Sequence, residues 1–323
     1  MKTSSRALLA ATLVASWGCD RGVHDGAIGE IAFDHYHSQA EIGAYLRALS
    51  EQYPGLVSFH SLGESQRGRD IPYLTLDATG RPDAPAVFLN GTHHGEEKSS
   101  TEAVLGVAAY LLSNRAEPGV QEILARYRFI LLPLVNPDGH AADTHGDAEG
   151  RDPNRDYAYP RRSEAESFHI PEIALLRGLQ DKAHFRAAIA YHSGMTGVLW
   201  PWAYGDDRPR DQAVFHTLAR TGAQAMEFSL YVQSYDDYPS RGEYSDYAYM
   251  KHGTLAVTFE VSSENAPPAG ELAGVVARAV RGSLAYLDGV RRLDDGVLAL
   301  DEDTVGHFGP LGPRRWRTDA PLE

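Results

Sequence analysis

The sequence predicts an α/β protein with a single domain, in which a mixed central β-sheet is flanked by helices on both faces. Between residues 33 and 290, short apolar runs typical of buried strands alternate with longer segments of helical periodicity. Such alternation favours a sheet that is covered on both sides. No internal repeat or linker-like stretch divides residues 33–290, so one domain is expected in this chain of 323 residues.

The expected elements follow in order from residue 33. Ser38 and Glu41 form a capping box, and apolar residues at helical spacing continue from it to residue 53. Further helices are expected over residues 99–112, 171–182, 210–227 and 271–287. Strands are expected over residues 56–59, 71–76, 86–90, 128–135, 186–191 and 255–259. A strong turn signal at residues 136–139 precedes a polar loop that runs to Pro160.

The two ends of the chain do not fit the domain pattern. Residues 1–19 place two cationic residues before a short apolar stretch, which is the layout of a secretory signal. Cys19 ends that stretch as in the lipobox of bacterial lipoproteins, so we expect a cleaved signal peptide or a lipoprotein signal. Residues 20–32 are expected to be a tether and residues 291–323 a C-terminal extension. The protein is therefore expected to be exported, either to the cell envelope as a lipoprotein or as a secreted protein.

The composition excludes some classes of partner. A formal net charge of −14 argues against binding to nucleic acid, which normally needs a basic face. Cys19 is the only cysteine, so no intrachain disulfide can form. We expect a monomer whose membrane attachment, if it has one, occurs only through a lipidated Cys19.

Residues that could bind a metal follow two of the expected strands. One strand leads into the run Thr-His-His-Gly-Glu-Glu, and another ends in His192. Two imidazoles and a carboxylate with an open fourth position describe a catalytic zinc site. The His-x-x-Glu spacing fits His94 with Glu97. It fits His93 with Glu96 equally well, so the spacing alone leaves both registers open.

The run around these histidines resembles the motif Gly-x-His-His-Ala-Arg-Glu-x-x-Ser of the zinc carboxypeptidases of the carboxypeptidase A type (funnelins). Further segments match the motifs of that family in the same order. They are Asn136-Pro137-Asp138-Gly139, Gly150-Arg151-Asp152-Pro153-Asn154-Arg155, His192-Ser193, Tyr238-Pro239-Ser240-Arg241-Gly242 with Asp246-Tyr247-Ala248-Tyr249, and Thr258-Phe259-Glu260. The resemblance covers residues 33–290 and favours the register with His94 and Glu97.

The resemblance implies one zinc ion per chain, held by His94, Glu97 and His192. When bound there, zinc would acidify a water molecule in its open position. Glu260 would act as the general base that takes the proton of this water and returns it to the leaving amine.

The resemblance also implies how the end of a peptide is recognised. Asn154 and Arg155 would hold the terminal carboxylate of the substrate, because a guanidinium can donate two parallel hydrogen bonds to a carboxylate. Tyr238 would fold over the bound residue and exclude water. Peptide or protein C-termini are therefore the expected substrates.

The sequence departs from the family pattern in two places. Glu96 stands where the family usually has an Arg before its metal-binding Glu. The family's Arg that polarises the scissile carbonyl falls on His145, whose imidazole would donate to the oxyanion instead. Arg151 is a second candidate for that role. In the family, the residues at positions 243–245 contribute to the pocket for the terminal side chain of the substrate. Glu243 would there favour a basic side chain.

Three hypotheses about function follow. The first is a zinc-dependent metallocarboxypeptidase that removes single residues from peptide C-termini. The second is a cell-wall carboxypeptidase of the same fold that trims the stem peptides of peptidoglycan. The third is a non-catalytic peptide-binding module, which the missing oxyanion Arg favours and the intact set of metal ligands opposes.

Overall fold

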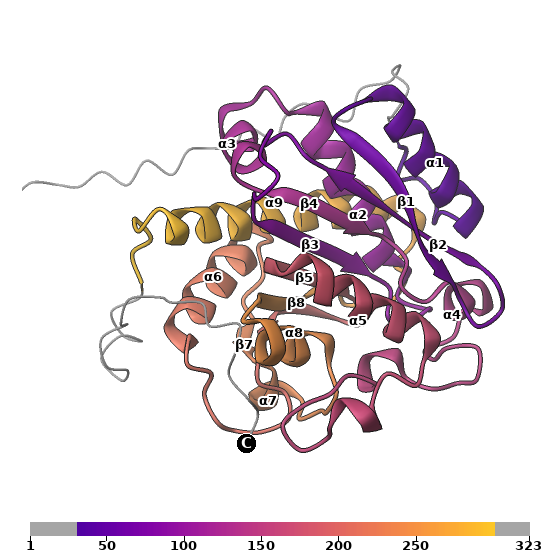
Figure 1. The fold of residues 1–323 in the computed structure, drawn as a ribbon, viewed down its shortest axis with the longest axis vertical. Coiled ribbons are helices and arrows are strands. Elements are labelled where there is room, and N and C mark those ends of the chain that lie inside the picture. Colours follow the sequence, from indigo (N-terminus) through magenta and orange to yellow (C-terminus); the bar gives the residue numbers. More distant parts are fainter. Residues whose placement is uncertain (1–30, 301–323) are drawn as a thin grey trace, which may run out of the picture.

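The computed structural model describes residues 31–300, so the expected signal, Cys19 and most of the expected tether lie outside the described residues. Its centre is an eight-stranded mixed β-sheet with the strand order β1-β2-β4-β3-β5-β8-β6-β7 (Figure 1). The strands are β1 (Val57–Glu64), β2 (Asp70–Leu76), β3 (Ala86–Gly91), β4 (Arg128–Leu132), β5 (Phe185–His192), β6 (Met195–Trp200), β7 (Tyr231–Gln233) and β8 (Leu255–Ser262). Strands β4, β3, β5 and β8 run parallel, and antiparallel pairs join them to β2 and β6.

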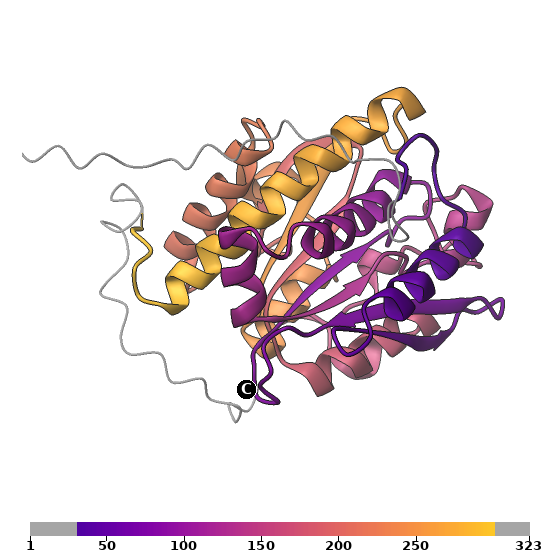
Figure 2. The same cartoon turned by 90° about the horizontal axis from the view of Figure 1, so that it is seen from above.

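Helices cover both faces of this sheet, as the sequence predicts (Figure 2). The longer helices are α1 (Gln39–Gln52), α2 (Lys98–Ser113), α3 (Pro118–Arg126), α5 (Pro171–Ala183), α6 (Gln212–Ala225), α8 (Tyr244–His252) and α9 (Ala269–Asp294). Shorter ones are α4 (Pro137–Ala142), α7 (Ser234–Asp237) and the 3-10 turns η1 (Pro153–Arg155) and η2 (Glu164–Glu166). The capping box predicted at Ser38 begins α1.

The two faces of the sheet carry separate hydrophobic cores. On β3, Val87 and Leu89 pack in the core that contains α1, α2, α3, α6 and α9. Phe88 lies between them in sequence and packs in the other core, with residues of α5 and α8. Every residue of β3 is buried, because successive side chains of a strand point to opposite faces and both faces are covered. The centre of the sheet is therefore a rigid base for the loops at its ends.

Some elements differ from the sequence prediction. Strand β8 continues to Ser262, which places Glu260 within the strand rather than at its end. Helix α3 and strands β6 and β7 were not expected. Helix α8 replaces part of the segment that resembles a mobile loop in the family, and residues 244–249 within it are all buried. A helix that is buried on every side shows no apolar stripe, so its sequence lacks the pattern by which helices are predicted.

The C-terminal part of the domain runs further than expected. Helix α9 ends at Asp294, so the boundary expected at residue 290 falls inside the helix. Leu298 and Leu300 then pack against the core that α9 helps to form. Within residues 31–300, no helix combines the length and the apolar character that crossing a membrane requires.

Candidate metal centre and active site

The carboxyl ends of three parallel strands bring the candidate residues together. β3 and β5 are aligned up to the pair Gly91 and Tyr191, so the residues that follow each strand emerge side by side. His192 is the last residue of β5 and pairs directly with Glu260 on β8. His94 follows β3 by three residues. Because the carboxyl ends of parallel strands meet at one edge of a sheet, the topology itself assembles this group.

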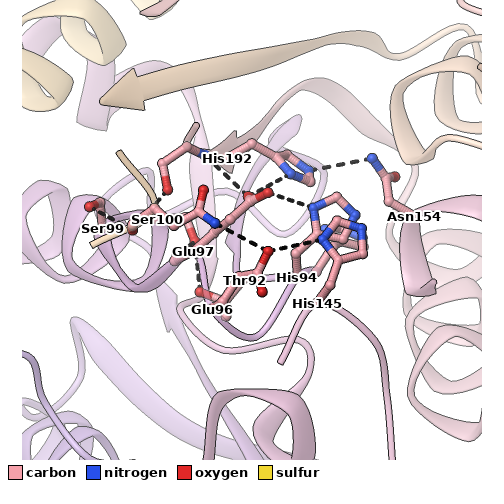
Figure 3. A network of polar contacts seen from close by, with 12 residues as sticks. Thr92, His94, Glu96, Glu97, Ser99, Ser100, His145, Asn154 and His192 are labelled. Carbon is pink, nitrogen blue, oxygen red and sulfur yellow. Dashed lines mark hydrogen bonds and ion pairs between the residues drawn. The ribbon is translucent and has the colours of Figure 1, made fainter. Parts of the chain in front are cut away.

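Glu97 lies between two histidines at the start of α2 (Figure 3). Its Oε1 lies 2.6 Å from Nδ1 of His94, and its Oε2 lies 2.9 Å from Nδ1 of His192. The backbone N–H of Ser193 donates to the same Oε2 at 3.1 Å and helps to fix the carboxylate. All three side chains are at least nine-tenths buried, and one ligand atom from each lies within 4.8 Å of the others. The structure therefore brings together the three residues for which the sequence suggests a shared metal ion.

The outer nitrogens of the two histidines also face polar groups. His94 Nε2 lies 3.0 Å from Oδ1 of Asp152, and His192 Nε2 lies 3.5 Å from Nδ2 of Asn154. Histidines that bind a metal through one ring nitrogen usually donate from the other to a carboxylate or similar group, which fixes the ring. His94 has such a carboxylate in Asp152, which leaves its Nδ1 for a metal. Nδ2 of Asn154 is itself a donor and gives His192 no such acceptor, so it is the contact of Nδ1 with Glu97 that places this nitrogen of His192 toward a metal. Two imidazole nitrogens, a carboxylate and an open fourth position suit zinc.

His93 and Glu96 do not share this centre. His93 Nε2 lies 2.8 Å from the hydroxyl of Tyr157, on the side of the core. The carboxylate of Glu96 accepts from Nδ2 of Asn265 at 3.1 Å and lies 3.3 Å from Nδ1 of His145. Within residues 31–300, the groups that could hold a metal ion all include His94 and none includes His93. The geometry thus favours the register with His94 and Glu97.

The charges around the centre reinforce one another. Burial disfavours the charged form of Glu97, but the adjacent His192 and His94 outweigh it and lower the pKa of Glu97. Burial also opposes the charge of Asp152, while hydrogen bonds from His145 and His94 lower its pKa. Both carboxylates are therefore ionised at neutral pH and available to a cation or to the histidines beside it.

Glu260 is a different kind of carboxylate. Its Oε2 is buried and accepts no hydrogen bond from the residues that the structure describes. Burial raises the pKa of Glu260 to about 8. The neighbouring His192 acts against that shift in the pKa of Glu260, whereas the nearby Glu97 adds to it. An unpartnered carboxyl group with a pKa near neutrality is suited to taking up and releasing a proton.

A family model described as zinc carboxypeptidase matches residues 42–280, which is more than half of the chain. The chain belongs to the zinc carboxypeptidase family. As a member it is a metallocarboxypeptidase, a hydrolase of peptide bonds. This confirms the family that the motifs suggest.

Relatives and solved structures agree with this assignment. Carboxypeptidase B of Astacus astacus is 27% identical over 59% of this chain and 72% of its own length. Carboxypeptidase A4 of Mus musculus is 24% identical over 72% of this chain, which spans 64% of that protein. The structure of carboxypeptidase A from Helicoverpa armigera superposes with a TM-score of 0.74 at 20% identity, covering 83% of this chain and 76% of that one. The shared fold confirms the single mixed-sheet domain.

The zinc carboxypeptidase places Asn154 and Arg155 beside the metal centre, in the turn η1. Asn154 is buried, and its Oδ1 accepts from the backbone N–H of Tyr244 at 2.9 Å, which ties η1 to the start of α8. Arg155 donates from Nη1 to the backbone carbonyl of Asn154 at 2.8 Å. Its guanidinium lies 4.0 Å from Asp152 and 3.7 Å from Glu243, beyond hydrogen-bond distance. One-third of the Arg155 side chain is exposed, so donors remain for a ligand.

Tyr238 is placed differently from the other candidates. It follows the short helix α7 as its C-terminal capping residue and is 66% exposed. Its position in the loop before α8 leaves its side chain open to solvent, and its role over a bound substrate stays a prediction.

The two candidates for the oxyanion donor have different surroundings. The ring of His145 stacks on that of His94 with 3.8 Å between centroids, and its Nε2 lies 3.3 Å from Oδ2 of Asp152. A hydrogen bond to Asp152 raises the pKa of His145, with burial acting against it. Arg151 instead bonds through Nε to Asp147 at 2.8 Å and through Nη2 to Gln66 at 3.1 Å. His145 is therefore the candidate beside the metal centre.

Asp152 also lies at the candidate metal site, although its residue type and spacing give it no role in the sequence. Besides facing His94 and His145, its Oδ1 accepts from the backbone N–H of Asn154 at 2.8 Å. It therefore couples the metal centre to the turn that carries Arg155. The available signal was its place two residues before Asn154 in the matched motif, but its contact with a histidine 58 positions earlier is visible only in three dimensions.

Proposed function

We propose that this zinc carboxypeptidase hydrolyses the C-terminal peptide bond of peptides or proteins with one zinc ion held by His94, Glu97 and His192. The observation that carries the proposal is the cluster of these three ligands, with Glu260 paired to His192 on the neighbouring strand. Zinc held by these residues would supply an acidified water and a positive charge beside the scissile carbonyl.

Glu260 is the proposed general base. It takes a proton from the attacking water and returns it to the nitrogen of the leaving residue. Its buried, unpartnered Oε2 supports this role, because once Glu260 is ionised this oxygen has no hydrogen bond to break before it accepts that proton. The register of β5 and β8 holds it beside His192 without any loop movement.

Arg155 and Asn154 are proposed to hold the free carboxylate of the terminal residue. Among the described residues, no carboxylate oxygen lies within 3.5 Å of the Arg155 guanidinium. Its donors can therefore form the two parallel hydrogen bonds that the carboxylate of a substrate accepts. Tyr238 is proposed to close over that residue from the exposed loop.

His145 is proposed to donate to the oxyanion. Both of its ring nitrogens lie 3.3 Å from carboxylate oxygens, of Glu96 and of Asp152. The developing charge on the carbonyl oxygen must therefore compete with one of these acids for an N–H, which predicts a weaker donor than the family's Arg.

A single set of assays tests this function. Purified protein should contain about one zinc per chain and should release only the last residue from peptides with a free C-terminus, as read by mass spectrometry. The same peptides with an amidated C-terminus should survive. Chelator should abolish the release and zinc should restore it, whereas Glu97→Ala should bind no zinc. Zinc-loaded protein that leaves every free-ended peptide intact would overturn the proposal.

The place of action is proposed as well. The signal-like residues 1–19 support export, with Cys19 as the site of lipid attachment. Cleavage of muropeptides in preference to ordinary peptides would move the proposal to a cell-wall carboxypeptidase. Tight binding of peptides without cleavage would move it to a binding module.

A further inference from the structure

Arg162 contacts the turn η1, which ends in Arg155. The chain reverses after Tyr159, and the backbones of Tyr159 and Arg162 donate to each other at 3.1 and 2.8 Å. The guanidinium of Arg162 lies over the ring of Tyr159, 5.3 Å from its centroid. Arg162 is half-buried, whereas its neighbour Arg161 is exposed. The reversal therefore directs one of two adjacent arginines onto η1 and leaves the other in solvent.

The guanidinium of Arg162 closes the end of η1. Its Nη2 donates to the backbone carbonyl of Arg155 at 2.7 Å and also to the carbonyl of Tyr157. Its Nε donates at 3.1 Å to the hydroxyl of the buried Ser167, which helps to fix the plane of the group. Carbonyls at the end of a helical turn have no partner within the turn and carry partial negative charge, so a cation suits them. One side chain thus joins the last residue of η1 to the segment that follows it.

The same guanidinium fits against Gly242 in the loop that leads into α8. The N–H of Tyr157 donates to the carbonyl of Gly242 at 3.2 Å, so this loop meets the segment after η1 through the backbone. Gly242 has a φ of 82°, which favours glycine. A Cβ there would lie 2.6 Å from the carbonyl oxygen of Arg155 and would overlap Nη2 of Arg162. The absence of a side chain at Gly242 therefore leaves room for the bond between Arg162 and η1.

The side chain of Arg155 has few restraints of its own. It donates to the backbone carbonyl of Asn154, while the carboxylates of Asp152 and Glu243 stand at 4.0 and 3.7 Å, beyond hydrogen-bond distance. The position of its guanidinium therefore depends on the backbone of η1, which Arg162 holds. A displacement of about 1 Å in a group that positions the substrate can cost roughly 100-fold in rate. What fixes η1 thus also fixes the site assigned to the terminal carboxylate.

We propose that Arg162 is a positioning residue, which holds η1 so that Arg155 meets the free carboxylate of the last residue of the substrate. The inference rests on the proposed function, because it concerns the residue assigned to that carboxylate. Arg162 bonds to backbone carbonyls and to Ser167, and these groups do not belong to the metal centre. Its loss should therefore weaken recognition of a free C-terminus and leave the zinc site intact.

Direct binding separates this role from a general effect on the fold. The background is the zinc-loaded full chain with Glu260→Gln, which should bind a peptide without cleaving it. Calorimetry compares two peptides of one sequence, one with a free and one with an amidated C-terminus. Adding Arg162→Ala should raise the dissociation constant of the free-ended peptide roughly 10- to 100-fold and that of the amidated peptide less than about two-fold. A merely structural defect would weaken the binding of both peptides alike.

Kinetics give an independent check in the chain that retains Glu260. Arg162→Ala should raise KM for free-ended peptides by a similar factor, with kcat and zinc content close to the wild-type values. Arg162→Lys keeps a cation that can donate to the carbonyls of η1 but lacks the fork that also reaches Ser167, so its KM should be intermediate. Gly242→Ala places a methyl group against the guanidinium and should raise KM as Arg162→Ala does.

The matched control is Arg161→Ala, which removes an exposed guanidinium from the adjacent position and should leave both dissociation constants unchanged. Equal weakening of the two peptides, or an unchanged dissociation constant of the free-ended peptide in Arg162→Ala, would overturn the role of Arg162 alone. If Arg162→Ala does not fold, Arg162→Lys makes the same comparison with a smaller expected change. A zinc-loaded wild-type chain that cleaves no free-ended peptide would overturn the proposed function instead.

Discussion

The residues proposed to bind the metal are held by strands and by one another, whereas those proposed to recognise the substrate lie on turns with partial exposure. We call the first set, together with the neighbouring base Glu260, the metal-binding half (His94, Glu97, His192 and Glu260). The second set is the recognition half (Arg155 and Tyr238, with Glu243 beside Arg155). In the metal-binding half, two strands and a helix start converge and the ligands contact each other at 2.6–2.9 Å. In the recognition half, charged groups stand 3.7 Å apart and Tyr238 is 66% exposed. Chemistry that is common to a family suits the rigid half, and selectivity that varies suits the other.

The sharpest way to separate the halves is to remove the proton acceptor from the metal-binding half. Glu260→Gln should lower kcat by about 10²- to 10⁴-fold, because general base catalysis is lost. Zinc content should not change, since Glu260 is not a ligand. Steady-state kinetics with metal analysis checks both. A variant that keeps its turnover would show that proton transfer is done elsewhere.

Removal of charge from the recognition half should have a smaller and different effect. Arg155→Ala should lower kcat/KM on free-ended peptides roughly 10- to 100-fold, because a charge-assisted hydrogen bond to the terminal carboxylate is lost. Most of the loss should be in KM, and discrimination against amidated peptides should shrink. Arg220→Ala, on α6, is the matched removal of a guanidinium from another helix and should leave that discrimination intact. Unchanged discrimination in Arg155→Ala would place carboxylate recognition elsewhere.

Asp152 connects the halves, so its loss should affect both. Asp152→Ala should weaken zinc binding about 10- to 100-fold, as removal of an outer partner of a metal-binding histidine does. It should also raise KM, because the side-chain oxygen that accepts from the backbone N–H of Asn154 is lost, and this bond holds the turn that carries Arg155. Competition with a zinc chelator measures the first effect and peptide kinetics the second. A change confined to KM would mean that His94 is oriented without Asp152.

The two halves also differ in how much of them the sequence predicts. His94, His192 and Glu260 follow or end apolar runs, so the pattern of buried strands locates them and the topology brings them together. Nothing local marks Asp152 as a partner of His94, because that contact joins residues 58 positions apart. The setting of Glu243 depends on α8, whose buried residues carry no amphipathic pattern.

The same reasoning explains the remaining elements. Short apolar runs predict strands well at the centre of the sheet, where β3 and β5 are almost wholly buried. Strand β7 has only three residues, too few to show a period. The side chains of His145 and Arg151 belong to one polar loop, and only tertiary contacts send one toward His94 and the other toward Asp147. Sequence patterns indicate burial and local conformation, and the directions of these two side chains depend on neither.

The smallest expected effect concerns stability rather than rate, and it belongs to the metal-binding half. In the metal-free protein, burial raises the pKa of Glu260 from 4.5 to about 8. Between these values the folded state keeps a proton that the unfolded state has lost, so this group's contribution to stability is intact below pH 4.5 and is lost as pH rises toward 8. Glu260→Gln cannot titrate. The metal-free variant should therefore melt higher than the metal-free wild type at pH 8, by on the order of a few degrees, and the gap should close toward pH 5. Thermal melts of both proteins across this range measure it. A difference in melting temperature that stays constant with pH would mean that the surroundings of Glu260 do not hold it protonated. The metal-binding half would then hold its general base without lowering the stability of the fold.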